Sequence, residues 1–137
     1  MIEPLKKVAD VFASDIALGR NFLRSELPHG VTAIITNPPY ESATAFVEHG
    51  LRLLEAVCRF THSPTLAFLL RTDFDHAKSR AHLFRDCPAF AKKIVLMRRI
   101  VWFEPEDGAK GKSPSFNHAW YIWDWSHEGP PTIGYGP

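Results

Sequence analysis

The sequence predicts an α/β domain with an open, mostly parallel sheet, flanking helices and a C-terminal antiparallel strand pair. Three observations predict this fold. Short apolar runs alternate with helical segments, the last two runs are joined by a loop alone, and the 137 residues are 45% hydrophobic and 23% charged. The whole chain, residues 1 to 137, is expected to form a single domain.

The first two apolar runs are expected to be buried strands that end on polar side chains. Residues 11 to 15, V-F-A-S-D, end on Asp15, and residues 31 to 36 are V-T-A-I-I-T. Glycine and proline between the runs indicate a loop with at most one helical turn. Because the second run is apolar on both faces, it is typical of a parallel sheet with helices on each side.

The middle of the chain predicts helix, strand and helix in turn. Residues 42 to 60 carry apolar side chains three and four positions apart, with charged residues opposite. A Ser-Pro pair breaks this helix, and T-L-A-F-L-L then predicts a third strand ending at Arg71. Asp75 could cap a second helix over residues 77 to 86, which Pro88 stops.

The C-terminal part is expected to add two strands. They lie at residues 93 to 103, K-I-V-L-M-R-R-I-V-W-F, and 118 to 125, H-A-W-Y-I-W-D-W. The composition of residues 104 to 117 indicates a surface loop, and a loop alone most simply joins an antiparallel pair. The tail, residues 129 to 137, is turn-rich and has no helical period.

Charge and cysteine content set loose bounds on function. The formal charge is +1, and a mild basic excess in the second half permits an anionic partner such as nucleic acid. Cys58 and Cys87 are expected to be small buried hydrophobic residues, and no metal site is predicted. No basic leader opens the chain and no apolar run approaches the roughly 20 residues of a bilayer span, so a cytoplasmic protein without a membrane segment is expected.

The stretch I-I-T-N-P-P-Y, Ile34 to Tyr40, ends a strand on residues that suit a ring-bearing ligand. Ligands of open α/β sheets collect at the carboxyl ends of strands. The prolines fix φ at roughly −65° and lack N–H groups, so the carbonyl of Pro38 stays available beside the side-chain oxygen of Asn37. With the face of Tyr40 next to them, these acceptors could receive a flat ring that bears an exocyclic NH2 group.

An aromatic amine is a poor nucleophile because its lone pair is delocalised into the ring. Acceptors for both of its protons favour a pyramidal nitrogen whose lone pair points outward, in line with a carbon donor. Holding two reactants in this geometry can supply roughly 7 to 11 kcal/mol in the best intramolecular cases. In this geometry the reaction needs no strong base at first.

This stretch resembles the (Asp/Asn)-Pro-Pro-(Tyr/Phe/Trp) motif of S-adenosylmethionine-dependent amino methyltransferases, most closely the adenine-N6-specific DNA enzymes. Similar motifs occur in enzymes that methylate guanine N2 in ribosomal RNA and glutamine in release factors. The order of elements over roughly residues 8 to 126 also resembles the family's Rossmann-like fold from its second strand onward. The resemblance implies methylation of adenine in DNA, with the base swung out of the stack. The residues that would hold the amine are Asn37, Pro38, Pro39 and Tyr40.

The resemblance also implies a site for the cofactor, S-adenosylmethionine. Asp15, with Ile16 beside it, corresponds to the acidic residue that holds the ribose, and Asn21 and Phe22 lie where the family often contacts the adenine ring. The family binds the methionine end with a Gly-rich loop, but no glycine precedes Gly19 here. The chain therefore resembles a shortened or split methyltransferase that another chain could complete.

Two functions stay open on these observations. One is an amino methyltransferase, and the other is a catalytically inactive or split remnant that acts as a dimeric binding or interaction module. A sheet without its central strand exposes an apolar edge, and exposed edges invite pairing, so a homodimer is expected.

Three other groups of residues have structural explanations. The D-F-D-H stretch at residues 73 to 76 is a better helix cap than a metal or acid/base site, because ligand spacing is absent. Four aromatic residues are expected to fill the core rather than stack bases, since neighbours in a strand point to opposite faces: Trp120, Tyr121, Trp123 and Trp125. Four basic residues could contact phosphates, although acidic neighbours in the loop weaken this interpretation: Arg98, Arg99, Lys110 and Lys112.

Overall fold

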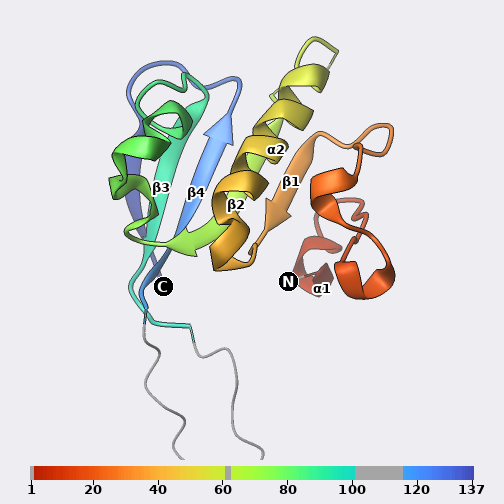
Figure 1. Cartoon of the computed structure of the whole chain (residues 1–137), viewed down its shortest axis with the longest axis horizontal. Helices are drawn as coiled ribbons and strands as arrows, with labels where there is room; N and C mark the ends of the chain where they lie inside the picture. Colours follow the sequence, from red (N-terminus) through yellow and green to blue (C-terminus); the bar gives the residue numbers. More distant parts are fainter. Residues whose placement is uncertain (1, 61–62, 101–115) are drawn as a thin grey trace, which may run out of the picture.

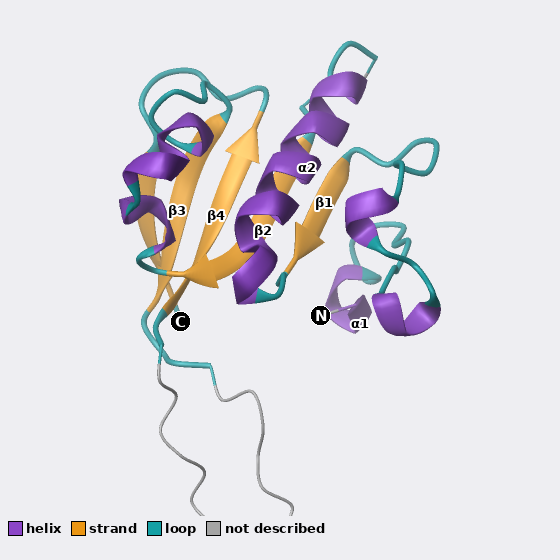
Figure 2. Ribbon diagram, in the orientation of Figure 1, coloured by secondary structure: helices purple, strands orange, loops and turns teal. Residues whose placement is uncertain are grey.

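The computed structural model describes residues 2 to 60, 63 to 100 and 116 to 137, which form a five-stranded sheet with flanking helices (Figure 1). The strands are β1 (Ala33–Thr36), β2 (Thr65–Arg71), β3 (Phe90–Leu96), β4 (His118–Asp124) and β5 (Thr132–Gly136). Their order across the sheet is β1-β2-β4-β3-β5. The predicted α/β class is confirmed, as the helices and strands of Figure 2 show.

The sheet is mixed rather than mostly parallel. β1 pairs with β2 in parallel and β3 with β5 in parallel, whereas β4 lies between β2 and β3 and is antiparallel to both. The antiparallel pair expected across the long loop is therefore present as β3 and β4. The sheet differs from the prediction because β4 enters between two strands that run in the same direction, which makes half of the pairings antiparallel.

The prediction of a strand at residues 11 to 15 is wrong. Residues 10 to 15 have no regular structure, and Asp15 is the N-cap of a short 3₁₀ helix, Ile16–Leu18. A strand needs the backbone N–H and C=O groups of a neighbour, and none of the described strands pairs with this segment. The apolar run consequently stays on the surface, with Phe12 51% exposed, and β1 forms one edge of the sheet.

The long helix is confirmed as α2, Ala43–Val57. Its apolar stripe packs on the sheet, so that Val47 and Leu54 are fully buried in the core. A second α-helix, α1, spans Ile2–Leu5 at the N-terminus. Within the described ranges, no helix is long and apolar enough to cross a membrane.

The second predicted helix is a six-residue 3₁₀ helix, Lys78–Leu83, instead of an α-helix over residues 77 to 86. Its N-cap is Ala77, which has no capping side chain, so the expected cap by Asp75 is wrong. The indole N–H of Trp123 donates to the carbonyl of Leu83 at 2.7 Å. This bond fixes the end of the short helix against the core and satisfies a carbonyl that the helix leaves open.

The tail contains a strand that the sequence did not predict. β5 pairs with β3 although it contains Gly134 and Gly136. A Cβ at Gly136 would lie 3.3 Å from the Cδ2 of Leu96, so the glycine makes room for that side chain. Strand propensity is low for glycine, and close backbone approach is the usual reason for glycine in a strand.

Aromatic side chains fill the core between the sheet and its helices. Tyr121 and Trp123 are fully buried, which confirms the prediction for these two residues. Phe84 lies against both, with ring centroids 5.5 Å from Tyr121 and 5.6 Å from Trp123. Trp120 and Trp125 are half-buried instead.

A polar network ties the carboxyl end of β2 to β3 and β4. The ammonium of Lys93 donates to both carboxylate oxygens of Asp75, at 2.9 and 2.8 Å, and to the carbonyl of Thr72 at 2.9 Å. The hydroxyl of Tyr121 donates to the carbonyls of Arg71 and Thr72, at 3.1 and 3.0 Å. Burial and the adjacent Asp75 raise the pKa of Tyr121, so its phenol stays protonated and remains a donor.

Some of the predictions for the C-terminal half concern residues outside the described ranges. Residues 101 to 115 lie outside the described ranges, and with them most of the loop at 104 to 117, Lys110 and Lys112. β3 ends at Leu96, well before residue 103.

The two cysteines are half-buried rather than fully buried. Cys87 packs beside the core, and this burial raises the pKa of its thiol.

We predict that Gly50→Val destabilises the fold by about 1 to 3 kcal/mol, because α2 crosses β2 at this position. A Cβ at Gly50 would lie 2.8 Å from the Cδ1 of the fully buried Leu66. Urea unfolding of both proteins measures the difference in unfolding free energy. The control Ala45→Val, on the exposed side of α2, should cost only about 0.5 kcal/mol of helix propensity. Equal stability of Gly50→Val and the wild type would contradict this account of the helix–sheet contact.

Candidate functional site

Three strands bring polar and aromatic side chains to one edge of the sheet. β1 and β2 are parallel, so their carboxyl ends lie at the same edge, and β4 begins there because it runs the other way. Asn37 and Tyr40 follow β1, Arg71 ends β2, and His118 begins β4. His118 is paired with Arg71 across the two strands. We call these four residues, with Pro38 and Pro39, the rim site.

Asn37 supplies a buried acceptor that the described part of the protein leaves unused. Its side-chain oxygen Oδ1 is buried and has no hydrogen-bond partner among the described residues. Pro38 is buried beside it, whereas Pro39 is exposed and its carbonyl accepts the backbone N–H of Ser42 at 3.1 Å. The amide oxygen that the sequence predicted as a receptor for an NH2 group is therefore buried and has no partner among the described residues.

Tyr40 is held by a histidine from a distant part of the sequence. Its hydroxyl is hydrogen-bonded to Nε2 of His118, and the two rings are stacked, with centroids 5.8 Å apart and an interplanar angle of 27°. Tyr40 is 42% exposed and His118 only 2% exposed. One face of the rim site is thus a half-exposed aromatic ring anchored on a buried imidazole.

The electrostatics of the rim site favour a neutral His118. Burial lowers its pKa below the ordinary value, and the positive charge of Arg71 lowers that pKa further. Arg71 itself makes two hydrogen bonds to the carboxylate of Asp73, at 3.0 and 2.7 Å, and lies 3.9 Å from the ring centre of Phe116. Hydrogen bonding from Arg71 in turn lowers the pKa of Asp73.

The D-F-D-H carboxylates therefore act as partners of cations of the chain rather than as helix caps. Asp73 pairs with Arg71 at 2.7 Å, and Asp75 pairs with Lys93 at 2.8 Å. No cluster of three or more potential metal-binding side chains occurs within the described ranges.

The residues that the resemblance assigns to the cofactor are placed differently. Asp15 accepts the backbone N–H of Ala17 at 2.8 Å, and Asn21 accepts that of Leu23 at 3.0 Å. Ile16 is 76% exposed. Both polar side chains therefore act as local caps in the N-terminal segment, which lies beside β1 in Figure 1.

Phe22 is also engaged within the chain. Its ring stacks on Phe46 of α2 with centroids 5.1 Å apart and meets the edge of His49 at 5.0 Å. Gly19 has φ of 75°, but no other group approaches the place of its missing Cβ within 4 Å, so it serves an open turn. These residues alone do not fit the whole of S-adenosylmethionine, because none of them offers the backbone N–H cradle that its methionine end requires.

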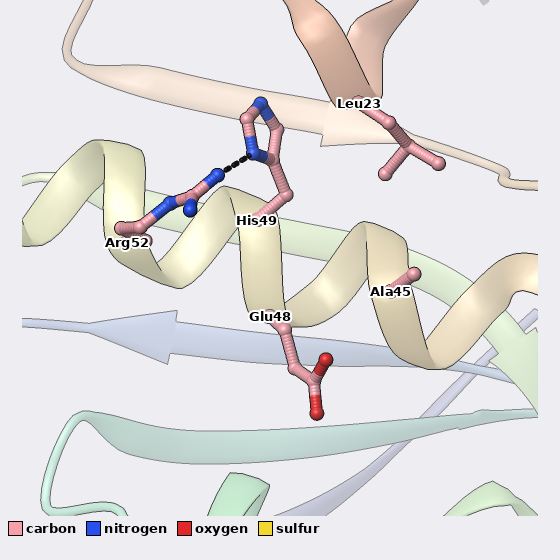
Figure 3. Close-up of a pocket in the computed structure, with 5 residues that line it drawn as sticks. All are labelled: Leu23, Ala45, Glu48, His49 and Arg52. Carbon is pink, nitrogen blue, oxygen red and sulfur yellow. Dashed lines mark hydrogen bonds between the residues drawn. The ribbon is translucent and has the colours of Figure 1, made fainter.

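A shallow hollow of about 380 Å³ lies between α2 and the N-terminal segment (Figure 3). It is lined by Leu23, Ala45, Glu48, His49 and Arg52. Arg52 donates to Nδ1 of His49 at 2.5 Å, so the proton of the neutral imidazole lies on Nε2 and is donated to the carbonyl of Ser25 at 3.1 Å. His49, itself hydrogen-bonded by Arg52, thus holds the N-terminal segment against α2, whereas Glu48 pairs with His82.

His118 is one of two rim residues, with Arg71, that the sequence analysis did not assign to a site. It stands first in the strand predicted at residues 118 to 125, and an antiparallel last strand must begin at the edge where its parallel neighbours end. The sequence does not determine which earlier strand becomes the neighbour of this strand. Of the proposed phosphate contacts, Arg98 is exposed, and Arg99 donates to the side-chain oxygen of Asn117 at 2.9 Å.

Comparison with known protein-family models gives no match to this chain, and comparison with curated proteins gives no significant match either.

We predict that His118 makes the fold less stable in acid. The unfolded chain protonates a histidine at an ordinary pKa of about 6.5, whereas the folded state holds the pKa of His118 lower. The unfolded state therefore binds more protons as the pH falls through this window, and stability falls with it. His118→Gln should show a smaller loss of unfolding free energy from pH 7.5 to 5 than the wild type, by urea unfolding at each pH. Parallel curves for the two proteins would contradict the shifted pKa.

Proposed function

We propose that this chain carries the amine-binding half of an S-adenosylmethionine-dependent amino methyltransferase, with N6 of adenine in DNA as its target. The observation that carries the proposal is the buried Oδ1 of Asn37, which has no partner among the described residues and lies three positions before Tyr40 in the chain. A buried acceptor without a partner costs about 1 to 3 kcal/mol. An exocyclic NH2 group of a bound ring would donate to that oxygen and recover this cost.

The surroundings of the rim site support a nucleotide as the substrate. Tyr40 and Phe116 are each 42% exposed, so both rings are accessible to a base. Arg99 adds positive charge near the same end of the sheet, where it donates to Asn117, whereas the charge of Arg71 is compensated by Asp73. Aromatic surface next to guanidinium groups suits a stacked base with a phosphate beside it.

The cofactor half is proposed to come from a complementing polypeptide. The side chains of Asp15 and Asn21 each accept one hydrogen bond from a backbone N–H two residues further along the chain. Ile16 and Phe22 lie in the same segment beside β1. A partner that paired with the free edge of β1 would stand next to this segment and supply the backbone N–H groups of the cradle. S-adenosylmethionine would then be the methyl donor in the completed protein, which we place in the cytoplasm.

We predict that the chain binds adenine through its amino group. A five-nucleotide single-stranded DNA with one central adenine should bind more tightly than the same DNA with a central purine that lacks the NH2 group, by roughly 10-fold, because one hydrogen bond to a buried acceptor is lost. Fluorescence anisotropy of labelled DNA measures both affinities. Asn37→Ala should abolish the difference, whereas Asn117→Ala, outside the rim site, should preserve it. Equal wild-type affinities for the two DNAs would end the proposal.

The second candidate is a dimeric interaction module without catalysis, favoured by the free edge of β1. No described strand pairs with the outer side of β1, and the side chains of Ala33 and Ile35 on one of its faces are exposed, with Ile35 at 40%, so this short strand is suited to pairing with a second copy.

We predict a dimer of twice the 15.5 kDa chain mass by light scattering at micromolar concentration. Ile35→Lys should shift it to the monomer, because a charged edge opposes strand pairing. Thr44→Lys, on α2, is the matched charge control and should leave the mass unchanged. A monomeric wild type would remove this candidate and leave the amine site untouched.

A further inference from the structure

We propose that His118 is a positioning residue whose neutral imidazole accepts the hydroxyl proton of Tyr40 and holds that ring across the amine site. This inference rests on the proposed function and adds to it the group that controls the site. It starts from one contact, the hydrogen bond between Tyr40 and Nε2 of His118, which joins the end of β1 to the beginning of β4.

The two residues differ in how firmly the fold holds them. Tyr40 lies in a single 3₁₀ turn, Tyr40–Ser42, and is 42% exposed, so packing alone gives its ring few constraints. His118 is 2% exposed and belongs to a strand that is paired on both sides. Stacking at 5.8 Å and the hydrogen bond therefore transmit the rigidity of β4 to the ring of Tyr40.

The direction of the hydrogen bond follows from the charge around the imidazole. A phenol with an ordinary pKa of about 10 is a good donor near neutral pH. Nε2 accepts that proton only in a neutral imidazole whose own proton is on Nδ1. Arg71 faces His118 from β2 and opposes a second positive charge.

The charged groups near His118 set the pH at which this contact is lost. Arg71 is held by Asp73, and Arg99 is linked to Asn117, the residue before His118. Protonation turns Nε2 into a donor, which removes the acceptor for Tyr40. Affinity for an adenine ring should therefore be constant near neutral pH and fall below the ordinary histidine range, while Asp73 stays ionised.

The first part of the test is NMR of the free protein, which does not depend on any ligand. The ring signals of Tyr40, assigned by comparison with Tyr40→Phe, should titrate with the same midpoint as the imidazole of His118. In Tyr40→Phe the midpoint of His118 should move. Independent titration of the two rings would overturn the proposal whatever the protein binds.

The second part measures affinity for the five-nucleotide single-stranded DNA with one central adenine. Tyr40→Phe and His118→Phe keep a ring and remove one partner of the hydrogen bond, so each should weaken binding by roughly three- to tenfold. The double variant should be no weaker than the weaker single variant. His118→Gln keeps an acceptor and should retain most of the affinity while losing its acid dependence. The control is His82→Gln, at an exposed histidine paired with Glu48 on α2. This variant should retain both the affinity for the DNA and the acid dependence of that affinity.

The outcomes separate this inference from the proposed function. If the wild type prefers adenine over the purine lacking NH2 but His118→Phe binds as the wild type does, the positioning role is overturned and the function stands. If the wild type has no such preference while the two rings still titrate together, the function fails, and the role in amine binding fails with it. Unfolding curves of each variant show whether a loss of affinity reflects loss of the fold.

Discussion

The structure depends on the insertion of β4 between β2 and β3. β4 pairs along its whole length with β2 and over Ala119 to Trp123 with β3, so without it the sheet would separate into β1–β2 and β3–β5. Its inward side chains, Tyr121 and Trp123, are the largest fully buried groups of the core. Its first residue, His118, reaches the edge where β1 and β2 end. One strand thus joins the two halves of the sheet, fills the core and completes the rim site.

Much of the fold follows from local periodicity. The spacing of apolar residues in α2 and the apolar runs of β1 and β2 agree with the environment that each element meets, so sequence and structure coincide there. Residues 11 to 15 show the limit of this reasoning, because an apolar run becomes a strand only beside a pairing partner. The helix expected at residues 77 to 86 shows a second limit, because the contact between Trp123 and Leu83 links residues far apart in the sequence.

The residues of the rim site, too, were predicted only where a local pattern identifies them. Asn37 and Tyr40 were predicted because a local motif ends a recognisable strand, and the structure leaves the oxygen of Asn37 without a partner among the described residues. His118 was missed because its role depends on which strand lies next to β2, which composition and period do not determine. Asp15 and Asn21 were assigned by resemblance, and both side chains instead cap local turns. The motif carries its chemistry in a few adjacent residues, whereas a cofactor cradle needs several segments at once.

The cost of the Asn37 oxygen supports the proposal that this group serves binding rather than folding. A domain of this size is stable by only about 5 to 15 kcal/mol, and an unsatisfied buried acceptor removes about 1 to 3 of these. A fold selected for stability alone would turn the amide to water or replace it with an apolar residue. Here Pro38, buried after Asn37, fixes the backbone that carries the amide, and Tyr40 is tied to His118. The chain thus keeps an acceptor buried and ties the ring of Tyr40 to His118, and the proposed amine donor would complete the hydrogen bonding of that acceptor.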